Sequence, residues 1–454
     1  MFSGGEGVRR RLKLSGLMVG GLVILLLLTM SPRALPAEPG KTREISSGSA
    51  PFPYVTGHAY HILPSTHNSE SGYFSLCEGR DGKIYVGTAK YGVNSFLVEF
   101  DPVTKTQKIV IDTNQVCGLA PRGYNEAQSK IHSRNFVSQS GKIYVGSMEA
   151  PTKPDDPTKY PGGYVMVYDP HTEVAESLGI AHPQMGVIDV VADEARDMLY
   201  IVLIDAKKSW MTYDLKTKKY QALGPIPTVF GTTLKDARGH ANVITKDFGL
   251  AQYNPETGKV QVRDIIVDGV KLKPGPPGTW VPTWNLAQDG RTAYLIQMQD
   301  PTLYAIDLFS EGPEVKAVSY GKMLAGSNPD SRCALSIAPD GRVYAVIRVD
   351  NETGFGRFYL HHLVRFDPQQ NAMEDLGVLR VENPNFFFES PGTKRGHPAT
   401  NDEHPPYYGY HTLPDGALTP LYNHLAMIVT AEGAIYVTII YPFTLLKIEA
   451  SVLR

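Results

Sequence analysis

A short phrase repeats along the chain and restricts the folds that it can adopt more than any other feature. The phrase is a turn that ends in Gly, followed by a strand rich in Ile, Val and Tyr, as in residues 81–87 and 140–146. Residues 340–346 and 432–438 repeat it closely, and looser copies at 196–202, 238–244 and 289–295 bring the number to seven. Such repetition indicates a chain built from copies of one supersecondary unit.

A second phrase follows each copy of the first, namely an apolar strand that ends at Asp-Pro, Asn-Pro or a variant. It occupies residues 96–102, 164–170, 211–215, 250–255, 303–308, 362–368 and, without the proline, 443–450. Several copies continue through a turn into a short strand with alternating polar residues, such as 219–223 and 373–376. Each unit is therefore predicted to be a meander of four antiparallel strands, A to D, with the Gly turn between A and B.

A lone meander cannot bury both faces of its sheet, but seven arranged radially can, because each face packs on its neighbour. The composition agrees, since 43 Gly, 34 Pro and 25 Tyr in 454 residues suit many short strands joined by turns. Unrelated hairpins in a β-sandwich would not explain the fixed order of the two phrases. The sequence predicts an all-β, seven-bladed β-propeller with four-stranded antiparallel blades over residues 56–454.

The two ends of the repeat region predict how the ring closes. After the last strand C only residues 451–454 remain, which are too few for a strand D. Residues 59–64 resemble an outer strand and lie just before the first strand A. We expect this N-terminal segment to pair as the outermost strand of the blade that contains residues 435–440, because closure removes an exposed sheet edge.

The first 37 residues are predicted to be a signal peptide. Basic residues at 9–13 precede an apolar run at 17–30, and small residues follow around Ala37, where cleavage is expected. The alternative is an uncleaved anchor, because the apolar run approaches the length that spans a bilayer. Residues 38–55 then form a linker. The protein is expected to be exported, to the periplasm or the medium, and to touch a membrane only if this segment stays uncleaved.

Charge and cysteine content exclude several classes of function. A formal net charge of −2 and the lack of a long basic block argue against nucleic acid as a partner. The three cysteines are too few for a disulfide framework in a domain of this size. Cys77 and Cys333 lie in apolar runs, so we expect them in the core. Motifs for nucleotide binding and for acyl transfer are not found in the sequence.

The candidate site is predicted at the rim where each strand A begins. In propellers, the loops from strand D to the next A and from B to C share this rim. Blades six, seven, one and two are contiguous, so their polar residues form one arc, whereas the other blades supply apolar residues. Counting back nine residues from each turn Gly, or its equivalent, gives for blades one to seven Tyr73, His132, Ile188, Phe230, Val281, Arg332 and His424.

Long loops fall on the same polar arc. Residues 148–163 include Glu149 and Tyr160, and the longest connection, 384–421, is rich in aromatic residues and histidine. A loop of that length without strand periodicity is usually functional, so we expect it to lie over the rim. The residues predicted to bind a substrate are Arg134, Tyr160, His404, Tyr407, Tyr408 and His411.

Two alternatives concern the histidines. His397, His404 and His411 are spaced by seven residues and could hold a divalent metal ion with His424 and His132; no other cofactor is indicated. A single His at the top of a strand is also commonly a hydrogen-bonded structural residue. If His132 and His424 titrate near neutrality, function should change between about pH 5 and pH 8.

The repeat over residues 56–450 resembles the seven-bladed propellers of the broad gluconolactonase-like and NHL-repeat group, which implies architecture and not activity. Ile131, His132 and the strand at 141–146 carry a narrower resemblance, to propeller polysaccharide lyases of the ulvan-lyase type. Those enzymes use His and Tyr as acid and base and Arg to neutralise a uronate carboxylate. The resemblance implies a catalytic His132, although residues 147–151 lack the family's second His.

Two functions remain open on the sequence. The first is a lyase that cleaves an acidic polysaccharide or oligosaccharide by β-elimination. His132 or His424 would be the base, Tyr73 the acid or its partner, and Arg332 the stabiliser of negative charge. The second is a non-catalytic propeller that binds a glycan or a protein partner through the same rim.

Overall fold

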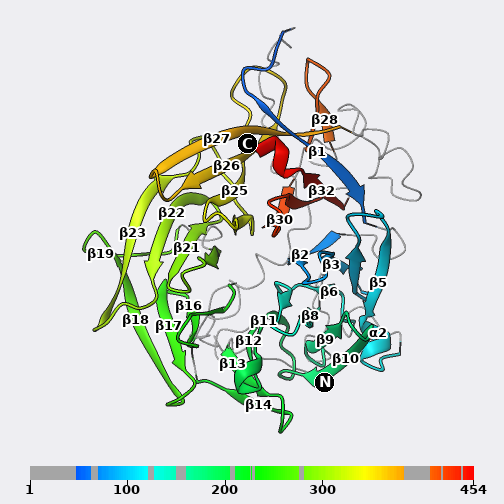
Figure 1. Ribbon diagram of the computed structural model, residues 1–454, viewed down its shortest axis with the longest axis vertical. Helices are drawn as coiled ribbons and strands as arrows, with labels where there is room; N and C mark the ends of the chain where they lie inside the picture. The colour runs from blue at the N-terminus through cyan, green and yellow to red at the C-terminus, as the bar shows by residue number, and fades with distance from the viewer. Residues whose placement is uncertain are drawn as a thin grey trace, which may run out of the picture.

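The computed structural model describes residues 48–62, 70–90, 92–120, 127–149, 160–204, 210–224, 226, 231–275, 281–382, 410–420, 423–440 and 443–453. Antiparallel sheets surround a common centre in these residues (Figure 1). Short helical turns occur at α2 (Thr113–Val116), η2 (Glu194–Arg196) and η4 (Ala450–Leu453). No helix in this part of the chain is long and apolar enough to cross a membrane. The expected signal segment lies outside the described residues.

The repeated phrases form strands B and C of each sheet, as predicted. In blade order, the B strands are β3 (Ile84–Ala89), β8 (Ile143–Met148), β12 (Met198–Leu203), β16 (Ala241–Ile244), β21 (Thr292–Gln297), β25 (Val343–Asp350) and β31 (Ile435–Ile440). The C strands are β4 (Phe96–Phe100), β9 (Tyr164–Asp169), β13 (Trp210–Asp214), β17 (Gly249–Asn254), β22 (Asp300–Asp307), β26 (Tyr359–Asp367) and β32 (Thr444–Ile448).

Strands A lie innermost and strands D outermost. The A strands are β2 (Glu70–Glu78), β7 (Phe136–Val137), β11 (Val187–Asp193), β15 (Leu234–Lys235), β20 (Pro282–Leu286), β24 (Leu335–Ile337) and β30 (Asn423–Val429). The D strands are β5 (Gln107–Asp112), β10 (Val174–Ile180), β14 (Lys219–Ala222), β18 (Lys259–Val267), β23 (Glu314–Lys322), β27 (Ala372–Val381) and β1 (Tyr54–His61). Four short strands are added, namely β6 (Lys130–Ile131), β19 (Val270–Lys271), β28 (Tyr410–Thr412) and β29 (Leu418–Pro420).

The residues of the repeat are those that its two tight turns require. The Gly between strands A and B has a positive φ, for example 75° at Gly82 and 84° at Gly433, a conformation that glycine adopts without steric cost. In blade three Asp197 takes this place with a φ of 51°. Between strands C and D, the carboxylates of Asp101 and Asp367 accept backbone N–H bonds from two residues further on. This local cap explains the Asp before Pro.

Each pair of neighbouring blades encloses its own apolar core. Tyr144 and Val165 of blade two, for instance, share a cluster with Val190 and Ile201 of blade three. Equivalent clusters join every other adjacent pair, including blade seven with blade one. Seven interfaces between seven sheets form a closed ring, because neither face of any sheet is left without a partner. The fold is therefore the predicted all-β, seven-bladed propeller.

The predicted closure by an N-terminal strand is confirmed. Ala59 of β1 pairs antiparallel with Leu446 of β32, so β1 supplies the missing outer strand of blade seven. The strand begins earlier than expected, at Tyr54, and its first half pairs in parallel with β27 of blade six. One strand therefore joins two blades at the closure point.

Candidate functional site

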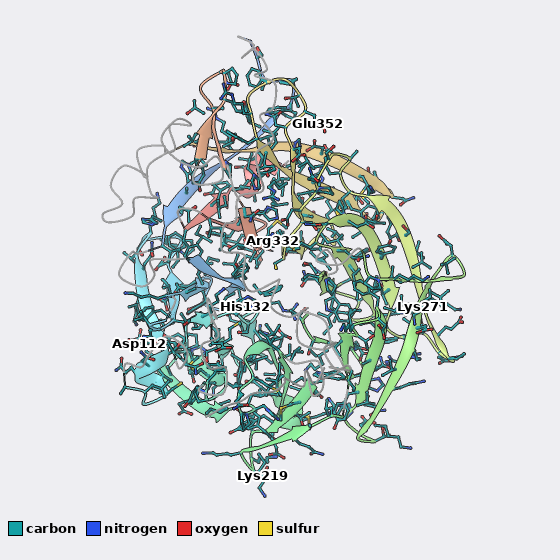
Figure 2. The ribbon with its side chains drawn as sticks, turned by 180° about the vertical axis from the view of Figure 1, so that it is seen from behind. Asp112, His132, Lys219, Lys271, Arg332 and Glu352 are labelled. Atoms are coloured by element: carbon teal, nitrogen blue, oxygen red, sulfur yellow. The ribbon has the colours of Figure 1, made fainter. Side chains whose placement is uncertain are left out.

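The four polar rim residues lie where the sequence pattern placed them, at the start of inner strands. Tyr73 belongs to β2 and His424 to β30, while His132 precedes β7 and Arg332 precedes β24. Figure 2 shows His132 and Arg332 near the centre of the ring, away from the outer positions of Lys219 and Lys271. We call these four side chains the rim residues.

Tyr73 and His132 form a contact between blades one and two. Their ring centroids are 5.0 Å apart, and the Nζ atom of Lys130 lies 4.5 Å from the centroid of the Tyr73 ring. Lys130 is held in place because β6 pairs with β3 of blade one and with β8 of blade two. The pair thus combines a phenol, an imidazole and a cation at one seam.

Tyr73 has a φ of 68°, in the left-handed region. A residue other than Gly is strained in that conformation, and such strain commonly accompanies functional sites. The strand interrupts its pairing with β3 between Ser71 and Leu76, which gives the backbone room for this turn. Cys333, directly after Arg332, has a φ of 52°. Two inner strands therefore bend at the same rim.

Arg332 belongs to an ion-pair cluster on blade six. Its Nη2 atom lies 2.8 Å from Oδ2 of Asp330, and Nη2 of Arg348 lies 3.5 Å from the same oxygen. Burial alone would raise the pKa of Asp330, but the two guanidinium groups hold it well below its usual range. Asp330 thus stays ionised, and the three groups together carry one net positive charge.

His424 lies beside this cluster and is 1% exposed. Its ring centroid is 5.4 Å from that of His361, edge to face. Burial is the main cause that lowers the pKa of His424 to about 3. The charge of Asp330 raises this pKa, and the charges of Arg348 and Arg332 lower it. His132 is 3% exposed, and burial together with Lys130 lowers its pKa well below the usual value.

These pKa shifts overturn the expectation that the two histidines titrate near neutrality. The imidazole of His424 is neutral from pH 5 to pH 8, and burial shifts the pKa of His132 in the same direction. Sequence position alone could not reveal this burial. A neutral imidazole can still accept a proton, so the shift leaves His132 chemically able to act as a base.

A cluster of apolar residues, which we call the apolar layer, lies next to Tyr73 and Arg332. Phe74 of blade one packs with Val281 and Met298 of blade five and with Cys333 of blade six, and Tyr73 lies against this cluster. Blades one and five are not neighbours in the ring, yet residues of both belong to this cluster. Phe74 also lies 5.3 Å from the His132 ring, measured between centroids. The cluster thus joins Phe74 and Cys333, the residues that directly follow Tyr73 and Arg332.

Arg134 lines a cavity of about 80 Å³ within the channel, which Phe74 and Cys333 of the apolar layer also line. In blades one, two, six and seven, the cavity is lined by residues that follow the rim residue along the chain. Examples are Leu76 after Tyr73 and Met427 after His424. The Nη2 atom of Arg134 donates to the Thr233 carbonyl at 2.8 Å. Arg134 thus reaches from blade two towards blade four.

Tyr160, also predicted to bind substrate, is buried, and its hydroxyl lies 3.1 Å from Oε1 of Gln128. Burial and the nearby carboxylate of Glu149 raise the pKa of Tyr160 well above its usual range. Burial also raises the pKa of Glu149 to about 7. This arrangement anchors the start and end of the blade-two loop.

The remaining predicted residues fall largely outside the described part of the chain. This applies to His397, His404, Tyr407 and Tyr408, and of His411 only the backbone, in β28, is described. The hairpin of β28 and β29 pairs with the outer strand β27 at Val381, so this end of the long loop lies towards the circumference. The position of the rest over the rim stays a prediction.

No group of three metal-ligating side chains occurs within the residues that the structure describes. The expected metal ligands at 397 and 404 lie outside them, and the metal expectation stays open.

Sequence reasoning missed three charged residues at the site, namely Lys130, Asp330 and Arg348. Arg348 interrupts the apolar run of β25, and a charge within such a run is a usable signal. Lys130 directly precedes the Ile131-His132 pair, and Asp330 lies two residues before Arg332. Their convergence depends on blade packing, which the repeat pattern does not specify.

Two solved structures share this fold over 87% of the chain and 99% of their own length, each with a TM-score of 0.50. One is the β-propeller domain of Cps50 (Swd1) from Myceliophthora thermophila, at 10% identity. The other is a catalytically inactive virginiamycin B lyase from Staphylococcus aureus with quinupristin, at 7% identity. At such identities the likeness shows a β-propeller fold alone. No family model and no curated protein matches the sequence.

Proposed function

We propose that this chain is an exported propeller whose rim binds an acidic, uronate-bearing oligosaccharide or polysaccharide and cleaves it by β-elimination. The observation that carries the proposal is the contact between Tyr73 and His132, joined through the apolar layer to the Arg332 side of the rim. A phenol, a neutral imidazole and cations around one channel mouth are the groups that this reaction requires.

Each rim residue has a role in the proposed reaction. The neutral imidazole of His132 accepts the proton on the carbon α to the uronate carboxylate. The electron pair forms a double bond to the β carbon as the bond from that carbon to the glycosidic oxygen breaks. The Tyr73 hydroxyl gives its proton to the leaving oxygen. Arg332 binds the carboxylate and stabilises the enolate-like charge, since charge-assisted hydrogen bonds strengthen as charge develops.

A second candidate is a non-catalytic propeller that binds a glycan or a protein at the same rim. The observation that favours it is the pairing of Arg332 with Asp330 inside the protein, together with the burial of His132 and His424. Both features also suit residues that hold the blades together. Product formation separates the two candidates, because a binder yields none.

The test incubates the purified protein with a panel of uronate polysaccharides and follows the ultraviolet absorbance of the unsaturated product. We expect product with one class of chain and a loss on the order of a hundredfold in rate for His132→Ala. Arg332→Ala should lose roughly tenfold to a hundredfold, from one charge-assisted bond. Arg342→Ala is the matched control, because Arg342 pairs with Asp340 and Asp367 in an outward-facing turn.

Circular dichroism of the variants shows whether their folds are intact. Wild-type rates in both His132→Ala and Arg332→Ala would remove the rim residues from the mechanism. Binding without product in the wild type would select the second candidate.

The mass of the protein recovered from the producing cells tests export, because removal of residues 1–37 by a signal peptidase leaves a chain that begins at Glu38.

A further inference from the structure

The channel cavity, which Phe74 and Cys333 of the apolar layer help to line, has the composition of a small ligand pocket. Its volume of about 80 Å³ is below that of sites for drug-sized ligands, so it admits only a molecule of a few heavy atoms. The walls are mainly apolar, from Phe74, Leu76, Trp284, Leu335, Met427 and Ile428. Arg134 is the single charged residue among the described residues that line it. Apolar walls with one fixed charge favour a ligand that is part hydrocarbon and part anion.

Arg134 has hydrogen-bonding capacity that the described protein groups do not use. Its Nη2 atom donates to the Thr233 carbonyl, and its Nη1 atom lies 3.3 Å from Oδ1 of Asn285. Its Nε atom forms an ion pair with Oδ1 of Asp189 at 3.8 Å, a distance that is too long for a hydrogen bond. A guanidinium group carries five N–H donors in a planar fork that matches a carboxylate. Donors therefore remain for a ligand in the cavity.

Two buried polar atoms nearby are also without hydrogen-bond partners among the described residues. One is Oγ1 of Thr283, which lines the cavity, and the other is Oδ1 of Asp189, whose side chain is fully buried. Buried polar atoms in native proteins nearly always have partners. An unpartnered hydroxyl at the wall and an incompletely used guanidinium group both indicate that this space accommodates a polar group.

We propose that the channel cavity is a second binding site, which takes a short aliphatic carboxylate with its anionic end on Arg134 and Thr283. The alkyl end lies against Trp284 and Met427. This site uses Arg134 and Thr283, neither of which takes part in the reaction proposed at the rim.

The test uses butyrate as the probe, with butyramide as its neutral counterpart of the same shape. Protein labelled with fluorotryptophan reports on the cavity through Trp284, whose signal is assigned with the Trp284→Phe variant. We expect butyrate to shift the Trp284 signal and to raise the melting temperature, and butyramide to do neither. Arg134→Met should weaken butyrate binding by about tenfold or more, the value of a charge-assisted hydrogen bond.

Two further variants keep the test decisive. Arg332→Met removes a cation of the rim and should leave butyrate binding unchanged. Thr283→Val keeps the side-chain volume and removes the hydroxyl, so it should weaken binding severalfold even if Arg134→Met does not fold. No shift of the Trp284 signal, an equal response to butyramide, or loss of binding in Arg332→Met alone would overturn the proposal. Unchanged affinity in Thr283→Val, where Arg134→Met is unfolded, would do the same.

Discussion

His424 shows how strongly burial alters a residue that the sequence marks only as polar. It is 1% exposed and lies close enough to Asp330, Arg332 and Arg348 for all three charges to affect its pKa. Desolvation outweighs the attraction of Asp330, so the imidazole stays neutral in the folded protein. The sequence predicted the position of this residue on an inner strand, but its ionisation depends on the neighbours that blade packing supplies.

This shift predicts a dependence of stability on pH. The folded pKa of about 3 lies below the unfolded value of 6.5, so the folded state binds fewer protons. Stability from His424 is present above pH 6.5 and is lost as the pH falls towards 3. The side chain in His424→Gln does not titrate, so this variant does not lose that part of its unfolding free energy. The wild type should therefore lose about 2 kcal/mol relative to the variant between pH 7 and pH 5.

Denaturant unfolding at several pH values measures this difference. His171→Gln is the matched control, because His171 is exposed in the turn after β9. Its stability should follow the wild type at each pH. A constant difference between the wild type and His424→Gln from pH 7 to pH 5 would contradict the assigned neutral state.

At the scale of elements, β1 pairs with strands of two blades, whereas an ordinary edge strand pairs with one. It pairs with β32 to complete blade seven and with β27 to join blade six. Val55 and Ala59 are buried in the core between these two blades. Closure by an N-terminal strand was predictable, because the last blade visibly lacks a strand. The parallel pairing to β27 was not, since no repeat unit contains it.

Removal of β1 should therefore open the ring. A protein that lacks residues up to His61 exposes the edge of β32 and loses the burial of Val55 and Ala59. We expect a loss on the order of 4 kcal/mol in stability and aggregation through the free edge. Light scattering and thermal melting measure the two effects. A truncation that stops before Tyr54 is the control, and equal behaviour of both proteins would refute the closure role.

At the scale of the whole molecule, two repeated phrases determine the ring because each has a local physical cause. The Gly turn needs a positive φ, and the Asp before Pro caps the next turn, so both signals survive in the sequence. The site has no such local cause. Phe74 and Cys333, which directly follow Tyr73 and Arg332, share one apolar cluster through blade packing, which no repeat unit specifies. The repeat register therefore predicted where these residues lie along the chain, and their action at one site, with Arg134, stays a prediction.

The most direct test of the proposed function is a crystal structure of the His132→Ala variant with a uronate oligosaccharide, since loss of the base should leave the substrate uncleaved. We predict that the sugar lies at the channel mouth, with a carboxylate on Arg332 and the ring of the cleaved residue beside Tyr73. An oligosaccharide bound at the circumference, or no binding by a variant that keeps its fold, would contradict the proposal that the rim residues form the active site.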